Sequence, residues 1–345
     1  MSSAVLVPLF LVVGTALVWK GSVLLETSSE ALSAFYRLPP TVHGAVVVAV
    51  GSSFPEFSST VLSTLIHGEF ELGLSAVVGS AIFNVLAIPA ISGIAGRGMR
   101  TGRDLVFKEG LFYLFSVAAL LLTFSLAVIY HPVEGRRLTG ELTRGIALLP
   151  VLLYLLYIFI QQQDVQDHRT ELAHDAQEPA DGSTDAAAKE SFRPLLEWAK
   201  LAASLALILV GVEGLVRAAI RLGDAFGTPS FIWGVTVIAV VTSLPDTFVS
   251  VRLAKRGEGV VSLSNVLGSN IFDLLVALPA GVLIAGTTAV DFTVATPLMA
   301  FLTMATILLF ATMRTNLWVS RWENYLLLGT YIVFLVWVVL RAVVG

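Results

Sequence analysis

The 345-residue sequence contains no cysteine, which excludes a disulfide framework and any metal site built on thiolates. Charged side chains are also scarce, because Asp, Glu, Lys and Arg make up 13% of the chain against roughly 25% in an average soluble domain. Hydrophobic residues reach 56%, and the mean hydropathy is +0.85. This composition predicts a polytopic membrane protein with the lipid bilayer as its surroundings, neither an enzyme nor a partner of nucleic acid.

Long apolar runs predict ten membrane-spanning helices, since about 20 apolar residues cross a bilayer as a helix. The runs cover residues 4–25, 41–66, 72–96, 105–130, 143–163, 195–222, 230–254, 260–286, 292–313 and 323–343. The first run lacks the basic leader and the cleavage pattern of a signal peptide, so it is counted as a span. The predicted fold class is therefore an all-α polytopic membrane protein.

One stretch of the sequence occurs twice, as HGAVVVAVGSSFPEFSS (43–59) and as WGVTVIAVVTSLPDTFVS (233–250). A single shift along the chain superposes Ser53 on Ser243, Pro55 on Pro245, and Glu56 on Asp246. A second pair, GSAIFN (79–84) and GSNIFD (268–273), follows at nearly the same spacing. An internal repeat of this kind decides how the whole fold is interpreted.

The repeat divides the ten spans into two sets of five. An odd number of spans per repeat places the second half upside down in the membrane, which is the inverted-repeat architecture of many secondary transporters. The expected domains are a first repeat over 1–163 with its motif at 49–84, and a second repeat over 195–345 with its motif at 239–273. Residues 164–194 form an acidic segment with few apolar side chains, which predicts a disordered linker.

Basic residues predict the orientation, because Lys and Arg accumulate on the cytoplasmic side. Most of the 21 Lys and Arg residues fall on one side when both termini are placed outside. We therefore expect extracellular termini, a cytoplasmic linker and a location in the plasma membrane. The oligomeric state is left open.

Glu56 and Asp246 each lie deep in an apolar span, where a charged side chain costs roughly 2.5–3.5 kcal/mol on insertion scales. Such residues predict a functional site. The proline before each acid removes a backbone donor and breaks the helix, which we expect to release the carbonyls of Ala49 and Ala239. Carbonyls of an unwound helix can coordinate a cation.

Further oxygen donors surround the two acids in both halves. Ser53 and Ser243 precede the acids by three residues and share their helix face. The second motif places its polar side chains four residues apart, behind glycines (Gly79 and Gly268) that permit close helix approach. The remaining donors of the predicted site are Ser52, Ser80, Asn84, Thr242, Ser269 and Asp273.

A site made of carboxylate, amide, hydroxyl and carbonyl oxygens suits hard cations, and its flexibility suits Ca²⁺ better than Mg²⁺. The same oxygens suit Na⁺. Because the empty and fully charged site is costly to bury, one divalent or several monovalent ions can compete for it, which predicts coupled antiport. No cofactor beyond the transported ions is expected.

The strings GSSFPE with GSAIFN, and TSLPDTF with GSNIFD, resemble the two alpha-repeats of the cation/calcium exchanger superfamily. The fuller strings around them look closest to the potassium-dependent sodium/calcium exchangers. The resemblance implies that Glu56 and Asp246 are the central calcium ligands, also used by sodium. An Asp at position 273 is typical of the potassium-dependent branch, and K⁺ cotransport stays open. The chain departs from the family pattern at two positions. Val241 stands where members usually have Gly, and Ala76 stands where an Asn is common, while Asn265 keeps that Asn in the second repeat.

Several polar residues are interpreted without a role in the site. Glu26, Glu30 and Glu213 are assigned to the ends of the first and sixth spans, which slide against the core in the family that the chain resembles. His43, His67 and His131 are assigned to solvent or headgroups. Two other functions stay open at this point, namely calcium/proton exchange through the same acids and a calcium-permeable channel.

Overall fold

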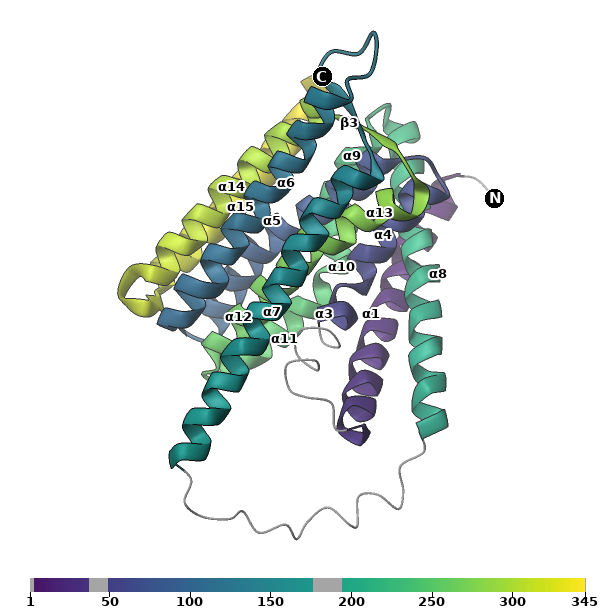
Figure 1. The fold of residues 1–345 in the computed structure, drawn as a ribbon. Helices are drawn as coiled ribbons and strands as arrows, with labels where there is room; N and C mark the ends of the chain where they lie inside the picture. Colours follow the sequence, from purple (N-terminus) through teal and green to yellow (C-terminus); the bar gives the residue numbers. More distant parts are fainter. Residues whose placement is uncertain (1–2, 37–48, 176–193, 345) are drawn as a thin grey trace.

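The structure is a computed structural model that describes residues 3–36, 49–175 and 194–344. It is a bundle of long helices that run in both directions between two ends (Figure 1). The end at which α7 stops and α8 starts is called the linker end below. The predicted location of His43 and the start of the predicted span 41–66 lie outside the described residues.

Helices of the first half follow the predicted spans. They are α1 (Ser3–Phe35), α3 (Ala49–Ser52), α4 (Phe54–Leu65), α5 (Phe70–Ala95), the π-helical η2 (Leu105–Gly110), α6 (Leu111–Tyr130) and α7 (Arg144–Asp175).

The second half contains α8 (Pro194–Phe226), α9 (Ser230–Trp233), η3 (Gly234–Ile238), α10 (Ala239–Thr242), α11 (Leu244–Lys255), α12 (Gly259–Phe272), η4 (Asp273–Ala277), α13 (Leu278–Ala285), α14 (Phe292–Arg314), η5 (Thr315–Leu317) and α15 (Arg321–Val344).

Eight helices of the described residues are long and apolar enough to cross a membrane, and the bent pair Ser230–Thr242 and Leu244–Lys255 makes up to nine. Together they confirm a helical membrane protein. Two predicted boundaries were wrong. The first helix continues to Phe35 rather than ending at 25, and α7 continues to Asp175, into the predicted linker. Residues 164–175 contain neither Gly nor Pro, the two residues that disfavour a helix most, so the helix can continue past the apolar run.

The centre of the bundle is α5, whose most apolar window is 94% buried. The continuous segment from α12 through η4 to α13 lies beside it, and 78% of its most apolar window is buried. These two segments carry the GSAIFN and GSNIFD motifs, so the second motif of each half lies in the interior, away from lipid. Gly79 permits the contact that the sequence predicted, because a Cβ there would lie 2.8 Å from the backbone of Val235. Gly268 does not, since the nearest described atom would be 3.9 Å away.

α1 and α8 form an antiparallel pair on one side of the bundle (Figure 1). Their backbones approach at Gly14 and Gly211, where a Cβ on either residue would lie 2.9 Å from the other's carbonyl oxygen. Small residues permit this kind of close crossing in membranes. Arg221 of α8 covers the ring of Phe10 at 5.3 Å, which adds a contact toward the N-terminal end of α1.

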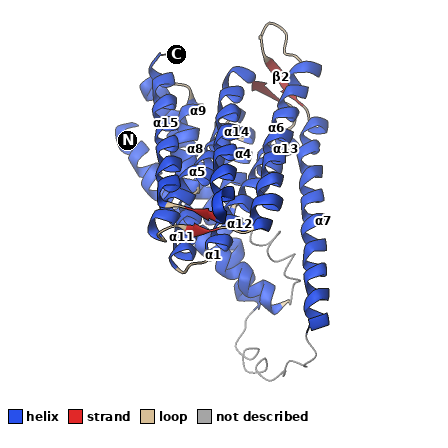
Figure 2. Ribbon diagram, turned by 90° about the vertical axis from the view of Figure 1, so that its left-hand side faces the viewer, coloured by secondary structure: helices blue, strands red, loops and turns tan. Residues whose placement is uncertain are grey.

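Two short antiparallel sheets connect loops, a feature that the all-α prediction missed. β1 (Met99–Arg100) pairs with β4 (Trp318–Val319), and β2 (Thr139–Leu142) pairs with β3 (Thr288–Asp291). They lie toward opposite ends of the bundle (Figure 2). Each sheet joins a loop of the first half to a loop of the second half, so the halves are connected outside the helices as well.

Candidate cation-binding site

Both helices that carry the duplicated acids are interrupted at the serine that precedes the proline. Ser53 separates α3 from α4 with φ −94° and ψ 6°, and Ser243 separates α10 from α11 with φ −83° and ψ −3°. The second break bends the helix by 45°. Pro55 and Pro245 occupy the first turn of the following helices, where a missing N–H is tolerated. The predicted helix breaks are therefore present, and each places an acid in the first turn of a new helix.

The break at Ser243 does not release the Ala239 carbonyl as the sequence predicted. This oxygen accepts the Ser243 N–H at 3.3 Å and the Thr242 hydroxyl at 3.2 Å. A carbonyl oxygen has two lone pairs and both are engaged here, so a cation at this oxygen has to displace one of these long bonds. Ala49 is the first residue of α3, at the start of the described part of its helix.

Glu56 is 2% exposed and reaches across from the first half to the second. Its Oε1 accepts the Ser80 hydroxyl at 3.0 Å, and the Ser80 oxygen lies 2.7 Å from the Ser243 hydroxyl. Thr242 also lies next to this carboxylate. The first acid is thus surrounded by hydroxyls from both halves of the chain, as the sequence predicted for the set.

The other two acids are buried in similar surroundings. Asp246 is 7% exposed, lies next to Ser269 and interacts electrostatically with Glu56. Asp273 is 1% exposed, lies next to Ser53 and also interacts with Glu56. The structure therefore gathers the acids from three helices around the middle of the bundle.

Three hydroxyls of the site donate their protons to backbone carbonyls. Ser53 donates to the Ser269 carbonyl at 3.4 Å, Ser269 to Val266 at 3.1 Å, and Thr242 to Ile238 at 3.1 Å. A hydroxyl whose proton is engaged in this way keeps its lone pairs for another partner. The hydroxyl oxygens therefore act alongside the carboxylates as electron-pair donors.

Three oxygens at the site are buried and accept no hydrogen bond from any described residue, namely Glu56 Oε2, Asn84 Oδ1 and Asp273 Oδ1. A buried acceptor without a partner costs about 1–3 kcal/mol, and more when it is charged. All three are hard oxygen donors, the type that Ca²⁺ and Na⁺ bind. The arrangement is therefore suited to a cation as the missing partner.

Two residues that sequence analysis missed orient Asn84. Its Nδ2 donates to Asn270 Oδ1 at 2.9 Å, which turns its own Oδ1 away from Asn270. Asn270 is fully buried and donates in turn to the Ala81 carbonyl and to the Tyr113 hydroxyl, both at 3.2 Å. The signal was present in the sequence, because the GSNIFD motif places Asn270 beside Ser269, but its partner Tyr113 comes from a distant helix.

The described residues contain no place where three carboxylate, imidazole or thiolate groups converge as metal ligands. The three acids are instead spread along the site, and hydroxyl and amide oxygens fill the space between them. A dispersed set of this kind suits a transported ion, which has to leave again, better than a permanently bound metal.

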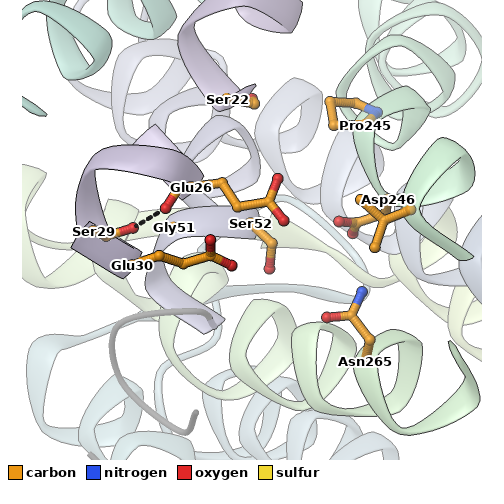
Figure 3. A pocket seen from close by; sticks show the side chains of 10 residues that line it. Ser22, Glu26, Ser29, Glu30, Gly51, Ser52, Pro245, Asp246 and Asn265 are labelled. Carbon is orange, nitrogen blue, oxygen red and sulfur yellow. Dashed lines mark hydrogen bonds between the residues drawn. The ribbon is translucent and has the colours of Figure 1, made fainter. Parts of the chain in front are cut away.

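A pocket of about 40 Å³ lies between Asp246 and the C-terminal part of α1 (Figure 3), which is the part of α1 nearest the linker end (Figure 1). Glu26 and Glu30 of α1 line it, together with Ser52 of α3 and Asn265 of α12. The sequence interpretation assigned these two glutamates to the end of the first span without a role in the site, and the structure shows both of them exposed and lining this pocket. That interpretation could not anticipate the pocket, because it ended the first helix at residue 25.

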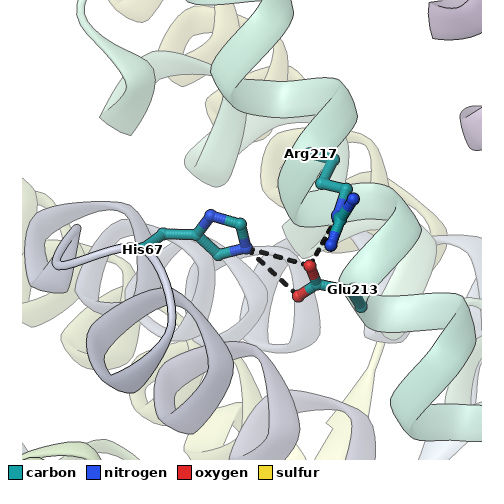
Figure 4. A network of polar contacts seen from close by, with 3 residues as sticks. All are labelled: His67, Glu213 and Arg217. Carbon is teal, nitrogen blue, oxygen red and sulfur yellow. Dashed lines mark hydrogen bonds and ion pairs between the residues drawn. The ribbon is translucent and has the colours of Figure 1, made fainter.

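His67 and Glu213 are paired, although the sequence interpretation assigned both to span ends. His67 Nε2 lies 3.1 Å from both carboxylate oxygens of Glu213 (Figure 4). Arg217, one turn along α8, donates to Oε1 of the same carboxylate at 2.6 Å. The contact ties α8 to the loop after α4.

Comparisons with known proteins identify the family and the fold. The chain is 26% identical over 348 residues to "Sodium/calcium exchanger MaX1" of Methanosarcina acetivorans, covering 95% of this chain and 97% of that protein. It is 43% identical to human "Sodium/potassium/calcium exchanger 5" over 53 residues, covering 15% of this chain and 11% of that protein. A structure of the sodium-calcium exchanger NCX_Mj has the same fold, with a TM-score of 0.58 at 24% identity and with 95% of this chain and 97% of that chain covered.

The family described as "Sodium/calcium exchanger protein" matches residues 6–162 and 196–340, which is most of the chain and leaves out the segment between its halves. The protein therefore belongs to the sodium/calcium exchanger family, within the cation/calcium exchanger superfamily.

Proposed function

We propose that the protein is a secondary antiporter that exchanges Ca²⁺ for Na⁺ by alternating access through the site around Glu56 and Asp246. The observation that carries the proposal is the set of buried, unpartnered oxygens at Glu56, Asn84 and Asp273. One Ca²⁺ or several Na⁺ ions supply the missing partners, while the empty site leaves carboxylates buried without compensation. Movement between the two sides is therefore favourable only with ions bound.

The proposed ligands are the twelve residues predicted from the sequence, and they act on transported ions rather than on a resident cofactor. The relatives that are named for an activity are exchangers, which supports a transporter without catalytic residues. MaX1, which matches nearly the whole chain, is named for sodium and calcium, and we extend that pair of ions to this protein.

The proposed topology has ten spans in two inverted repeats, 1–163 and 195–345, with both termini extracellular and the linker cytoplasmic in the plasma membrane. Reciprocal contacts support it, because Ser53 of the first half bonds the Ser269 carbonyl while Ser243 of the second half bonds Ser80. The sheets support it too. β1 and β4 follow spans that end on the proposed cytoplasmic side, and β2 and β3 lie on the other side.

Calcium-45 uptake into proteoliposomes tests the exchange. An outward sodium gradient should drive uptake by the wild type, and Glu56→Gln and Asp246→Asn should each reduce it to background, because each removes a charge that balances the ions. Glu258→Gln is the matched control, since Glu258 occupies the N-cap position of α12, outside the site. Sodium-driven uptake that survives both site variants would contradict the proposal.

The same assay decides between coupling ions. Uptake driven by a pH gradient without sodium would indicate calcium/proton exchange, and uptake without any counter-ion would indicate a channel. The likeness to human "Sodium/potassium/calcium exchanger 5" covers only 53 residues, so potassium cotransport needs a test of its own. The test is the same uptake assay with K⁺ added. We expect Asp273→Asn to reduce whatever stimulation potassium gives.

A further inference from the structure

The pocket beside Asp246 holds oxygen donors that the exchange site does not use. Ser22, Glu26 and Glu30 follow one another at four-residue spacing on α1, so they lie along one helix face. Asn265 of α12 and the carboxylate of Asp246 face them across the pocket (Figure 3). All polar side chains that line it end in oxygen or an amide group, the donor types of a hard-cation site.

The charges of the pocket repel one another in the absence of a cation. Glu26 interacts electrostatically with Glu30 and with Asp246, and like charges four residues apart disfavour a helix. Arg252 of α11 is also within electrostatic range of Glu26, so a single guanidinium offsets part of the charge of three carboxylates. The described surroundings therefore leave negative charge uncompensated at this place.

Ser22 is an independent indication of a ligand. It is 6% exposed, and its hydroxyl, buried at the deep end of this helix face, has no hydrogen-bond partner among the described residues. Ser28 and Ser29 of the same helix both donate to carbonyls of the preceding turn. A buried hydroxyl without this bond, on the wall of a pocket with two carboxylates, lacks a partner that a cation or its water can supply.

We propose that Ser22, Glu26, Glu30 and Asn265 form a second Ca²⁺ site at the linker end, from which the ion passes to Asp246. This deepens the proposed exchange function and rests on it. Glu26 and Glu30 are exposed while Asp246 is buried, so the carboxylates form a path from water to the exchange site. The volume of about 40 Å³ admits an ion with part of its water shell, and Ca²⁺ accepts water among its six to eight oxygen ligands.

Equilibrium binding of calcium-45 to the purified full-length protein tests the site without transport. The wild type should bind two Ca²⁺ ions, and Glu26→Gln/Glu30→Gln should lose the weaker one. Glu56→Gln should keep that weaker ion while losing the tighter one, and Glu258→Gln should keep both. Unchanged stoichiometry and affinity in Glu26→Gln/Glu30→Gln would overturn the inference, whatever happens to exchange.

Sided flux measurements give a second readout. Presented from the linker side, calcium should half-saturate exchange by Glu26→Gln/Glu30→Gln at a concentration on the order of tenfold higher than for the wild type, because clustered charges concentrate counter-ions. The maximal rate and the half-saturating concentration from the other side should stay unchanged. Equal changes from both sides, or none, would overturn the inference. The single variant Glu30→Gln, at the exposed end of the pocket, should show a smaller shift of the same sign.

The two proposals fail separately. If Glu56→Gln still exchanged calcium for sodium, the exchange mechanism would be wrong even with the weaker ion in place. If only the double variant behaved like the wild type, exchange would stand and the second site would not exist.

Discussion

At the scale of single residues, the site depends on which way an amide points. Asn84 can present either Oδ1 or Nδ2 to a cation, and only the oxygen binds one. The bond from its Nδ2 to Asn270 Oδ1 fixes the oxygen toward the site. The Nδ2 of Asn270 donates hydrogen bonds to the Ala81 carbonyl and to the Tyr113 hydroxyl, which keeps the Oδ1 of Asn270 facing Asn84. We therefore expect Asn270 to act as a positioning residue and not as a ligand of the ion.

Asn270→Ala should lower calcium affinity by about 10–100-fold, the range found when partners of metal ligands are removed. Calcium-45 binding measures the change, and the apparent affinity for sodium should fall with it. A merely structural role would lower thermal stability and leave affinity unchanged. Tyr113→Phe is the matched control, because it removes one acceptor from Asn270 but leaves the bond to Asn84, so its affinity should stay close to that of the wild type.

The sequence predicted the acids and hydroxyls of the site because they recur together in apolar surroundings. It did not predict Asn270 and Tyr113 as a pair, since a bond between residues 157 positions apart leaves no local pattern. The Ala239 carbonyl was misjudged for a related reason. A proline predicts that a helix breaks, but the nearby hydroxyl of Thr242 decides which carbonyl stays free.

At the scale of elements, the α1–α8 pair packs on itself more closely than on its surroundings. A Cβ on Gly211 would lie 2.9 Å from the Gly14 carbonyl oxygen, which leaves no room for it. A Cβ on Gly214, one turn on, would have its nearest neighbour at 3.7 Å. The pair therefore has a contact that holds its members together during any movement against the core.

Gly211→Ala and Gly214→Ala form a matched test of this contact. The methyl group at 211 would lie 2.9 Å from the Gly14 carbonyl and should destabilise the protein by about 1–3 kcal/mol, as overpacking does. At 214 the same change meets only ordinary contacts and should be neutral. Thermal unfolding in detergent measures both. Equal effects at the two positions would show that the crossing is not tight.

Helix length was the least predictable property at this scale. Hydropathy defines where lipid ends, but α1 and α7 continue past that point with polar residues. The extension of α1 is what brings Glu26 and Glu30 opposite Asp246. The strands were also beyond prediction, because two-residue strands such as β1 and β4 depend on a partner loop far away in the chain.

At the scale of the whole molecule, the two ends of the bundle differ. Toward the linker end, the pocket reaches Asp246 and Asn265. Ala76 occupies the position of Asn265 in the first repeat, and it packs in an apolar cluster with Val18 and Ile208 of the α1–α8 pair. At the end opposite to the linker end, His67 and Glu213 form a polar contact. We therefore expect ions to reach the proposed exchange site from the linker end in this conformation.

Labelling of single cysteines tests this asymmetry, and the natural chain, which has none, provides the background. A membrane-impermeant thiol reagent should modify Asn265→Cys from the linker side, and it should leave Ala76→Cys unmodified from either side. Both residues occupy the same place in their repeats, so each controls for the other. Rapid modification of both would contradict a single open side.

The contact between His67 and Glu213 should favour the conformation that is open only toward the linker end over one that is open toward the other end. Removing it with His67→Ala should speed the labelling of Ala76→Cys about fivefold, which corresponds to a loss of about 1 kcal/mol. Arg217→Gln is the control, because Arg217 bonds Glu213 within one helix and does not connect α8 to the rest of the protein. Unchanged labelling in the His67→Ala background would show that the contact does not restrain the pair.

The crossed serine contacts carry a consequence for each half on its own. Ser53 and Ser243 each complete their bonding with an oxygen supplied by the opposite half, through the Ser269 carbonyl and the Ser80 hydroxyl. A chain holding one half alone would leave these groups unmatched in its interior. We therefore expect neither half to carry an ion by itself unless the other half is supplied, as a separate chain or as a second copy.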